Sequence, residues 1–122
     1  MVAAKTKPEL FIIESLALKD EKAGRQEGDI ISRMLQLAGK TGTRYYYIRT
    51  LRELEKMIEL FGDSNYRYLH ISCHADKSGM GTTFDNVSYA DLGKMLRPHL
   101  SNRRVFVSAC QMACNSLAQE LL

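Results

Sequence analysis

The segment from Tyr66 to Cys73 reads Tyr-Arg-Tyr-Leu-His-Ile-Ser-Cys, and it decides the fold class. It is a short, largely apolar run that follows the turn-forming residues Gly62–Asn65, a pattern typical of a strand. A second run of this kind, Arg104–Cys110, reads Arg-Val-Phe-Val-Ser-Ala-Cys. Between the two, Ser88 is placed to cap a helix whose apolar residues recur at helical spacing. Strand, helix and strand in this order predict a pair of parallel strands joined by a crossover.

The same alternation extends in both directions along the chain. We expect a buried strand at residues 9–16, a helix over 20–40, a second strand at 44–49, a helix over 51–61 and a last helix over 111–122. The resulting order predicts the α/β class. It takes the form of a three-layer sandwich, in which a mostly parallel sheet of about four strands has helices on both faces. Residues 1–122 are expected to form one domain.

Composition limits the classes of function. The chain has 122 residues, 45% hydrophobic and 25% charged, which is typical of a globular domain that buries its own core. The net charge of +3 is spread along the chain, so nucleic acid is not expected as a partner. No apolar run approaches the length of a membrane span, and no signal peptide is evident. Three cysteines without a C-x-x-C pair favour free thiols and a cytoplasmic protein.

Two chemically reactive side chains follow the carboxyl ends of predicted strands. His74 comes directly after the strand that ends at Cys73, and Cys110 ends the later strand. In parallel sheets the working groups gather beyond the carboxyl ends of the central strands. If these two strands are neighbours, the His74 imidazole can take the proton of the Cys110 thiol. The start of the following helix would favour the thiolate, and its free N–H groups can bind an oxyanion.

These two strand ends resemble the signature strands of caspase-like cysteine peptidases of the CHAT type. The matching residues are Tyr-Leu-His-Ile-Ser-Cys-His-Ala at 68–75 and Arg-Val-Phe-Val-Ser-Ala-Cys-Gln at 104–111. The resemblance implies a cysteine endopeptidase that acts on a peptide or protein through a thioester and needs no cofactor. His74 would then be the general base and acid, Cys110 the nucleophile, and the backbone N–H groups of Ala75 and Cys110 the oxyanion donors.

The chain departs from this family pattern in two ways. Ala75 stands where the family usually has glycine, which would make a positive φ or a close substrate approach harder there. The sequence also ends about twelve residues after Cys110, before the strands that ordinarily complete the caspase-like sheet and pocket. We therefore expect the chain to be the N-terminal catalytic portion of the fold, which needs further strands, a partner subunit or a regulatory protein for full activity.

Other functions remain open or are disfavoured. A catalytically inactive scaffold or protein-binding module needs only the fold, and it remains the alternative. A zinc site formed by His70, His74 and Cys110 is disfavoured, because the two histidines lie two strand pleats apart, about 13 Å. No metal site is therefore predicted.

The remaining candidate side chains are interpreted as structural. Cys73 and Cys114 are expected to be structural thiols, with Cys73 on the strand face opposite His70 and His74. His70 is interpreted as a core histidine with a hydrogen-bond partner, and His99 as solvated. The carboxylates of Glu14, Asp76 and Asp85 and the dense basic clusters, which include Arg103 and Arg104, are interpreted as solvated groups.

Overall fold

The computed structural model describes residues 6–24 and 26–108. Within these residues the protein has an α/β fold in which helices and strands alternate along the chain. The elements, in chain order, are β1 (Lys7–Ser15), α1 (Leu18–Lys22), α2 (Glu27–Leu37), β2 (Arg44–Tyr47), α3 (Leu51–Asp63), β3 (Tyr66–Ala75), β4 (Gly79–Gly81), β5 (Asn86–Ser88), α4 (Tyr89–Leu96), the single 3₁₀ turn η1 (Arg97–His99) and β6 (Arg104–Ser108).

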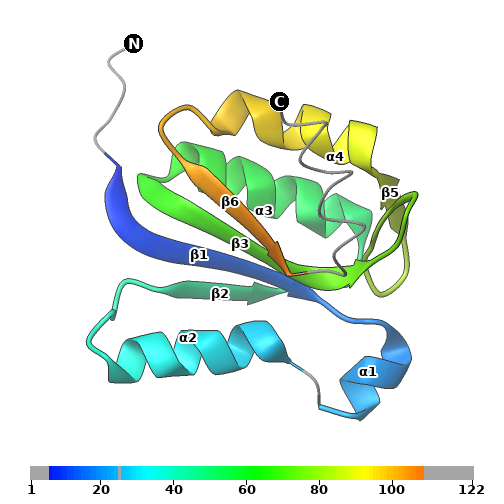
Figure 1. Ribbon diagram of the computed structural model, residues 1–122, viewed down its shortest axis with the longest axis horizontal. Helices are drawn as coiled ribbons and strands as arrows, with labels where there is room; N and C mark the ends of the chain where they lie inside the picture. Colours follow the sequence, from blue (N-terminus) through cyan, green and yellow to red (C-terminus); the bar gives the residue numbers. More distant parts are fainter. Residues whose placement is uncertain (1–5, 25, 109–122) are drawn as a thin grey trace.

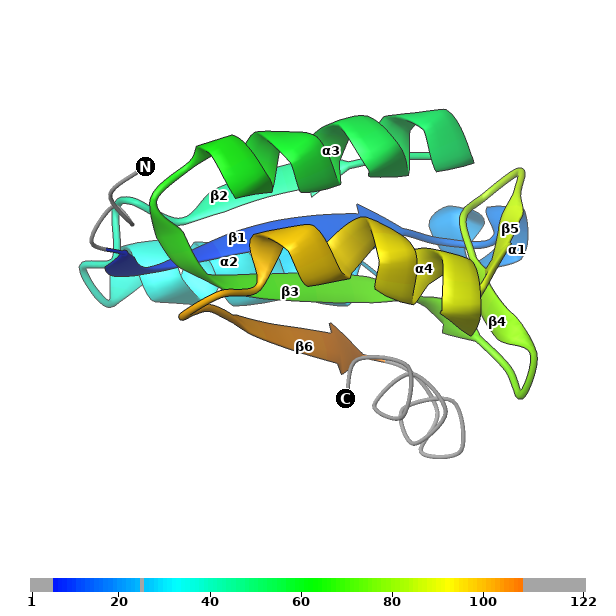
Figure 2. The ribbon, with the colours of Figure 1, turned by 90° about the horizontal axis from the view of Figure 1, so that it is seen from above.

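The sheet has a parallel part and an antiparallel extension. Strands β2, β1, β3 and β6 lie side by side in that order, and each pairs in parallel with its neighbour. Strands β4 and β5 pair antiparallel, starting from the carboxyl end of β3. Helices α3 and α4 lie on one side of the sheet, and α1 and α2 lie on the other (Figures 1 and 2). The predicted α/β class is confirmed, and the sheet is mixed because of the β4–β5 extension.

Three local differences from the predicted elements have simple causes. The expected helix over residues 20–40 is two helices, because Gly24 adopts a φ of +71° directly after α1 and breaks the helical path. The polar segment 76–88 contains β4 and β5, strands of only three residues each, which are too short to show a strand periodicity. The pairing of β1 with β3 is irregular between Lys7 and Leu10, where Pro8 has no N–H to donate.

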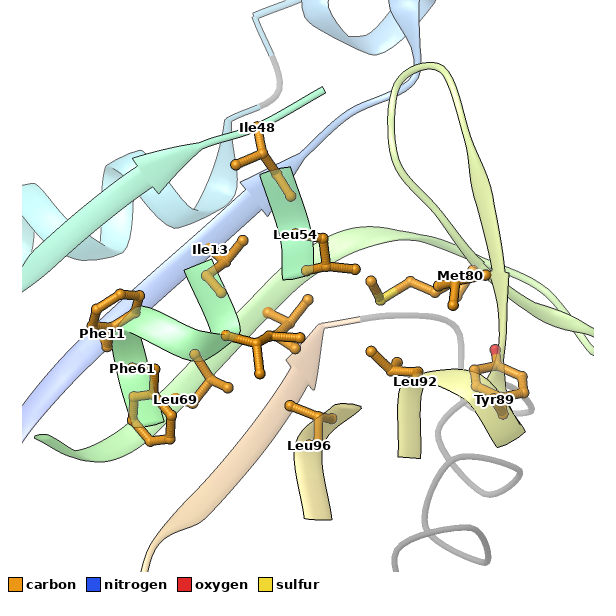
Figure 3. Packing of buried hydrophobic residues seen from close by; sticks show 14 of the residues in the cluster. Phe11, Ile13, Ile48, Leu54, Phe61, Leu69, Met80, Tyr89, Leu92 and Leu96 are labelled. Carbon is orange, nitrogen blue, oxygen red and sulfur yellow. The ribbon is translucent and has the colours of Figure 1, made fainter. Parts of the chain in front are cut away.

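The hydrophobic core fills the space between the sheet and the α3–α4 layer (Figure 3). Helix α3 begins at a capping box in which the side chains and backbone N–H groups of Thr50 and Glu53 hydrogen-bond reciprocally. Its apolar face then packs on β1 and β3, as the helical spacing predicts. The fully buried apolar side chains of the molecule are Phe11, Ile12, Ile13, Leu54, Ile58, Phe61, Leu69, Ile71, Met80, Leu92 and Leu96.

On the opposite face of the sheet, a buried carboxylate fastens α2 to β1. The side chain of Glu14 has no exposed surface, which contradicts the prediction that it is a solvated acid. It accepts hydrogen bonds from the backbone N–H groups of Gly28 (2.7 Å) and Asp29 (3.4 Å) in the first turn of α2, and from the Tyr45 hydroxyl of β2 (2.6 Å). A negative charge at a helix N-terminus is favourable, so burial of Glu14 is compensated by these donors.

A basic side chain is also less solvated than predicted. The Arg103 guanidinium donates to the backbone carbonyls of Phe61, Gly62 and Ser64 at the end of α3, at distances of 2.6 to 3.2 Å. It also lies over the Phe61 ring, 4.7 Å from the ring centroid. Partial burial lowers the pKa of Arg103. Arg103 therefore caps the last turn of α3, whereas its neighbour Arg104 is exposed as predicted.

The Glu14 contacts predict a specific loss of stability. Replacement Glu14→Ala leaves the donors of α2 and Tyr45 without their acceptor, so we expect the free energy of unfolding to fall by about 3 kcal/mol. Glu14→Gln keeps the shape and an acceptor oxygen, and it should cost less. Urea unfolding followed by circular dichroism measures both. The matched control is Glu59→Ala on the exposed face of α3, and equal unfolding midpoints for Glu14→Ala and Glu59→Ala would contradict this role.

Candidate functional site

His74 lies at the carboxyl end of β3 and is exposed to solvent. It lines a cleft of about 350 Å³, and the other walls come from the turn between β3 and β4, from both strands of the β4–β5 pair and from the start of α4. The lining residues besides His74 are Asp76, Ser78, Gly79, Gly81, Asn86, Val87 and Ser88. The predicted base therefore stands in a small, mostly polar cleft at this edge of the sheet.

The turn beside His74 is organised by one carboxylate. Oδ1 of Asp76 accepts hydrogen bonds from the Ser78 backbone N–H and hydroxyl, both at 2.8 Å, and from the Gly79 N–H at 3.1 Å. The Tyr89 hydroxyl donates to the Asp76 carbonyl, which joins this turn to α4. These bonds, chiefly those from Ser78, lower the pKa of Asp76. Asp76 is exposed, as predicted, but it is the hydrogen-bonded centre of the turn.

Ala75 fits this edge without backbone strain. Its side chain is 8% exposed and belongs to the core cluster. Asn102 is the residue other than glycine with a positive φ in the described part of the chain, so Ala75 has a backbone that any residue adopts. The Asp76 N–H donates to Gly79, and hydrogen-bonded pairs alternate along antiparallel strands. The Ala75 N–H is therefore directed away from β4.

Strand β4 approaches β3 from the β1 side. The backbone N–H of Thr83, just after β4, donates to Ser15 Oγ at 3.0 Å, and its hydroxyl donates to the Leu16 carbonyl at 2.6 Å. Ser15 and Leu16 lie at the end of β1, whereas β6 pairs with the other edge of β3. The prediction that the third and fourth predicted strands are neighbours is confirmed by this β3–β6 pairing.

The second half of the predicted dyad lies outside the described residues. Cys110, its expected backbone N–H donor, Cys114 and the helix expected over 111–122 all fall in 109–122. Strand β6 is described to Ser108, which pairs with Ser72. The distance between the His74 imidazole and the Cys110 sulfur is therefore not available as a test of the dyad.

The other predicted positions on β3 divide between the two faces of the sheet. Cys73 packs against the hydrophobic core cluster, as predicted. His70, on the α2 face, is half-buried, and burial lowers its pKa. Its Nε2 atom is buried without a hydrogen-bond partner among the described residues, so the predicted partner is absent at that atom. His99 is half-buried beside Gly62, where an added Cβ would lie 2.1 Å from its Nδ1, so its prediction as solvated holds only in part.

Several residues of the His74 cleft were missed by the sequence reasoning. Ser78, Asn86 and Ser88 lie in a segment interpreted only as a polar, glycine-containing stretch, with Ser88 assigned as a helix cap. The cap is confirmed, since Ser88 Oγ accepts from the Asp91 N–H at 3.2 Å. The order Asp-Lys-Ser-Gly at 76–79 is a turn signal, because an aspartate side chain commonly hydrogen-bonds the backbone two residues later.

Two searches of the described structure for other kinds of site are negative. Within residues 6–24 and 26–108, no three histidine, cysteine, aspartate or glutamate side chains are grouped so that they could hold a metal ion. Over the same residues, no helix combines the length and apolar character needed to cross a bilayer.

Neither the models of known protein families nor the curated proteins gave a match to this chain. The functional proposal below therefore depends on the residues and geometry of this molecule.

The Asp76 turn gives a prediction that is measured by pH titration. Its lowered folded-state pKa means that the carboxylate stabilises the turn at neutral pH, and that this contribution is lost as the pH falls through that pKa. NMR titration of the Asp76 carboxyl carbon should give a midpoint below the ordinary value of 3.8. In Ser78→Ala the midpoint should rise but stay depressed, because the backbone donors remain. An unchanged midpoint in Ser78→Ala would contradict the assignment of Ser78 as the main cause.

Proposed function

We propose that this chain carries the catalytic residues of a caspase-like cysteine endopeptidase, with His74 as general base and Cys110 as nucleophile. The single observation that carries the proposal is the register of β3 and β6. Tyr68 pairs with Arg104 and Ser72 with Ser108, a constant offset of 36 positions. His74 and Cys110 are separated by the same 36 positions in the sequence. Continuation of the pairing by two residues would make them direct neighbours on one face of the sheet.

The surroundings of His74 suit a proton-transfer role. Its side chain is exposed, so a substrate can reach it, and its backbone is held in the β3–β4 pairing opposite Gly81. The Ala75 N–H is directed away from β4 and toward the edge on which β6 pairs. An N–H group at that edge, together with that of Cys110, would bind the oxyanion that forms when a peptide carbonyl is attacked.

In the proposed reaction the His74 imidazole takes the Cys110 thiol proton, and the thiolate attacks the peptide carbonyl carbon. The peptide C–N bond then breaks, and the imidazolium returns the proton to the leaving amine nitrogen, which leaves a thioester on Cys110. A water molecule attacks the thioester while the imidazole takes its proton. The carboxylic product leaves, and the sulfur recovers the proton as a thiol. The overall reaction is hydrolysis, and its balance requires only the peptide and water.

The alternative is an inactive caspase-like module that binds proteins. The observation that favours it is a hollow of about 520 Å³ lined by Leu18, Glu21, Lys22, Arg49 and Phe84. Leu18 and Phe84 are 53% and 60% exposed, and the Arg49–Glu21 ion pair lies between helix α1 and the end of β2. Exposed apolar side chains beside charged ones are typical of protein-binding surfaces. This alternative predicts that Cys110→Ala leaves partner binding unchanged.

Covalent labelling distinguishes the two proposals. The probes are short peptides that carry an acyloxymethyl ketone and vary in the residue next to it, and mass spectrometry maps the label. We expect labelling of Cys110, with a rate at least about 100-fold lower in His74→Ala, because a positioned base contributes a factor of this order. His99→Ala is the matched control and should label at the native rate. Equal labelling of Cys73, Cys110 and Cys114, or rates unaffected by His74→Ala, would contradict the peptidase.

A further inference from the structure

A second cleft lies on the α2 face of the sheet. It has a volume of about 590 Å³, within the range of small-molecule pockets. Its walls come from β1, β3, β6, the last turn of α2 and the segment before β2, and it shares no lining residue with the His74 cleft. The proposed peptidase function does not use it.

Two buried polar atoms in this cleft have no partner. Oε2 of Glu9 and Nε2 of His70 both line it, and both are buried without a hydrogen bond to any described residue. Buried polar atoms are nearly always hydrogen-bonded in native proteins, since an unpaired one costs most of its desolvation energy. The cleft is therefore built to accept a polar group from a molecule that enters it.

The charges around the cleft are also uncompensated. Lys40 and Arg104 line it with exposed side chains, and Glu9 supplies a carboxylate. Over residues 6–24 and 26–108 the ion pairs are Arg33–Asp29 and Arg49–Glu21, so none of these three charges is paired. One anion and two cations thus line the same cleft without neutralising each other.

The remaining walls are apolar and aromatic. Leu10 and Leu35 come from β1 and α2, and the rings of Tyr68 and Phe106 lie with centroids 6.2 Å apart and their planes tilted by 45°. Phe106 is 49% exposed. An aromatic or large aliphatic group in the cleft would cover this ring and remove its apolar surface from water.

We propose that this cleft binds a small zwitterion, an α-amino acid with a large apolar side chain. The ammonium group donates to the Glu9 carboxylate and to His70 Nε2, the carboxylate faces Lys40 and Arg104, and the side chain packs against Phe106. Partial burial lowers the His70 pKa, which keeps the imidazole neutral and able to accept a hydrogen bond.

The test measures binding of three probes by NMR chemical-shift titration. L-Phenylalanine carries both charges, phenethylamine lacks the carboxylate, and 3-phenylpropionate lacks the ammonium. We expect L-phenylalanine to bind with a Kd of the order of 1 mM and each of the other two more weakly. Shifts should map to the described residues of the α2-face cleft. Absence of shifts with L-phenylalanine at saturating concentration would overturn the proposal, since it would mean that the cleft holds only water.

Variants assign each end of the ligand. Glu9→Gln should weaken L-phenylalanine and phenethylamine about tenfold and leave 3-phenylpropionate unchanged. Arg104→Gln should weaken L-phenylalanine and 3-phenylpropionate about threefold and leave phenethylamine unchanged. Lys94→Gln, on α4 across the sheet, is the matched control. Equal affinity of the three probes, with no effect of Glu9→Gln or Arg104→Gln, would overturn the proposal by showing apolar binding alone.

Discussion

The parallel pairing of β3 is the constraint on which the rest of the molecule depends. β3 is hydrogen-bonded to β1 along one edge and to β6 along the other, and beyond the end of β1 it also pairs with β4. This position divides its side chains between two environments. Leu69, Ile71 and Ala75 enter the core under α3 and α4, whereas His70 and Ser72 face the α2 side. Both clefts discussed above are lined by residues of this one strand.

A second constraint fixes the helical layer on the α2 face. Packing there is less apolar than under α3 and α4, and the buried Glu14 carboxylate supplies the attachment. Gly28 permits this close approach, because a Cβ at that position would lie 3.0 Å from Ile12 Cγ2 and 3.2 Å from the Glu14 carboxyl. A glycine in the first turn of a helix is therefore explained by contact with the strand beneath it, at the expense of helix propensity.

Much of the fold follows from periodicity in the sequence, and the exceptions follow from contacts between distant residues. The apolar spacing in 51–61 and 89–96 predicts α3 and α4, and the compact runs predict β1, β3 and β6. No local pattern shows that Glu14 meets Gly28 and Tyr45, or that Arg103 caps α3, because those partners are 14 to 42 positions away. His74 was predictable because catalytic groups follow the ends of parallel strands. The α2-face cleft has no such rule, since it depends on side chains from separate strands.

The central claim is that His74 and Cys110 act as one proton-sharing pair at the β3–β6 edge. The most direct measurement is the thiol pKa of Cys110, from the pH dependence of its alkylation rate with Cys73 and Cys114 replaced by serine. A neighbouring imidazole stabilises the thiolate, so the account predicts a pKa clearly below the ordinary value of about 8.5, restored toward that value in His74→Ala. A Cys110 pKa near or above about 8.5 that does not change in His74→Ala would contradict the account.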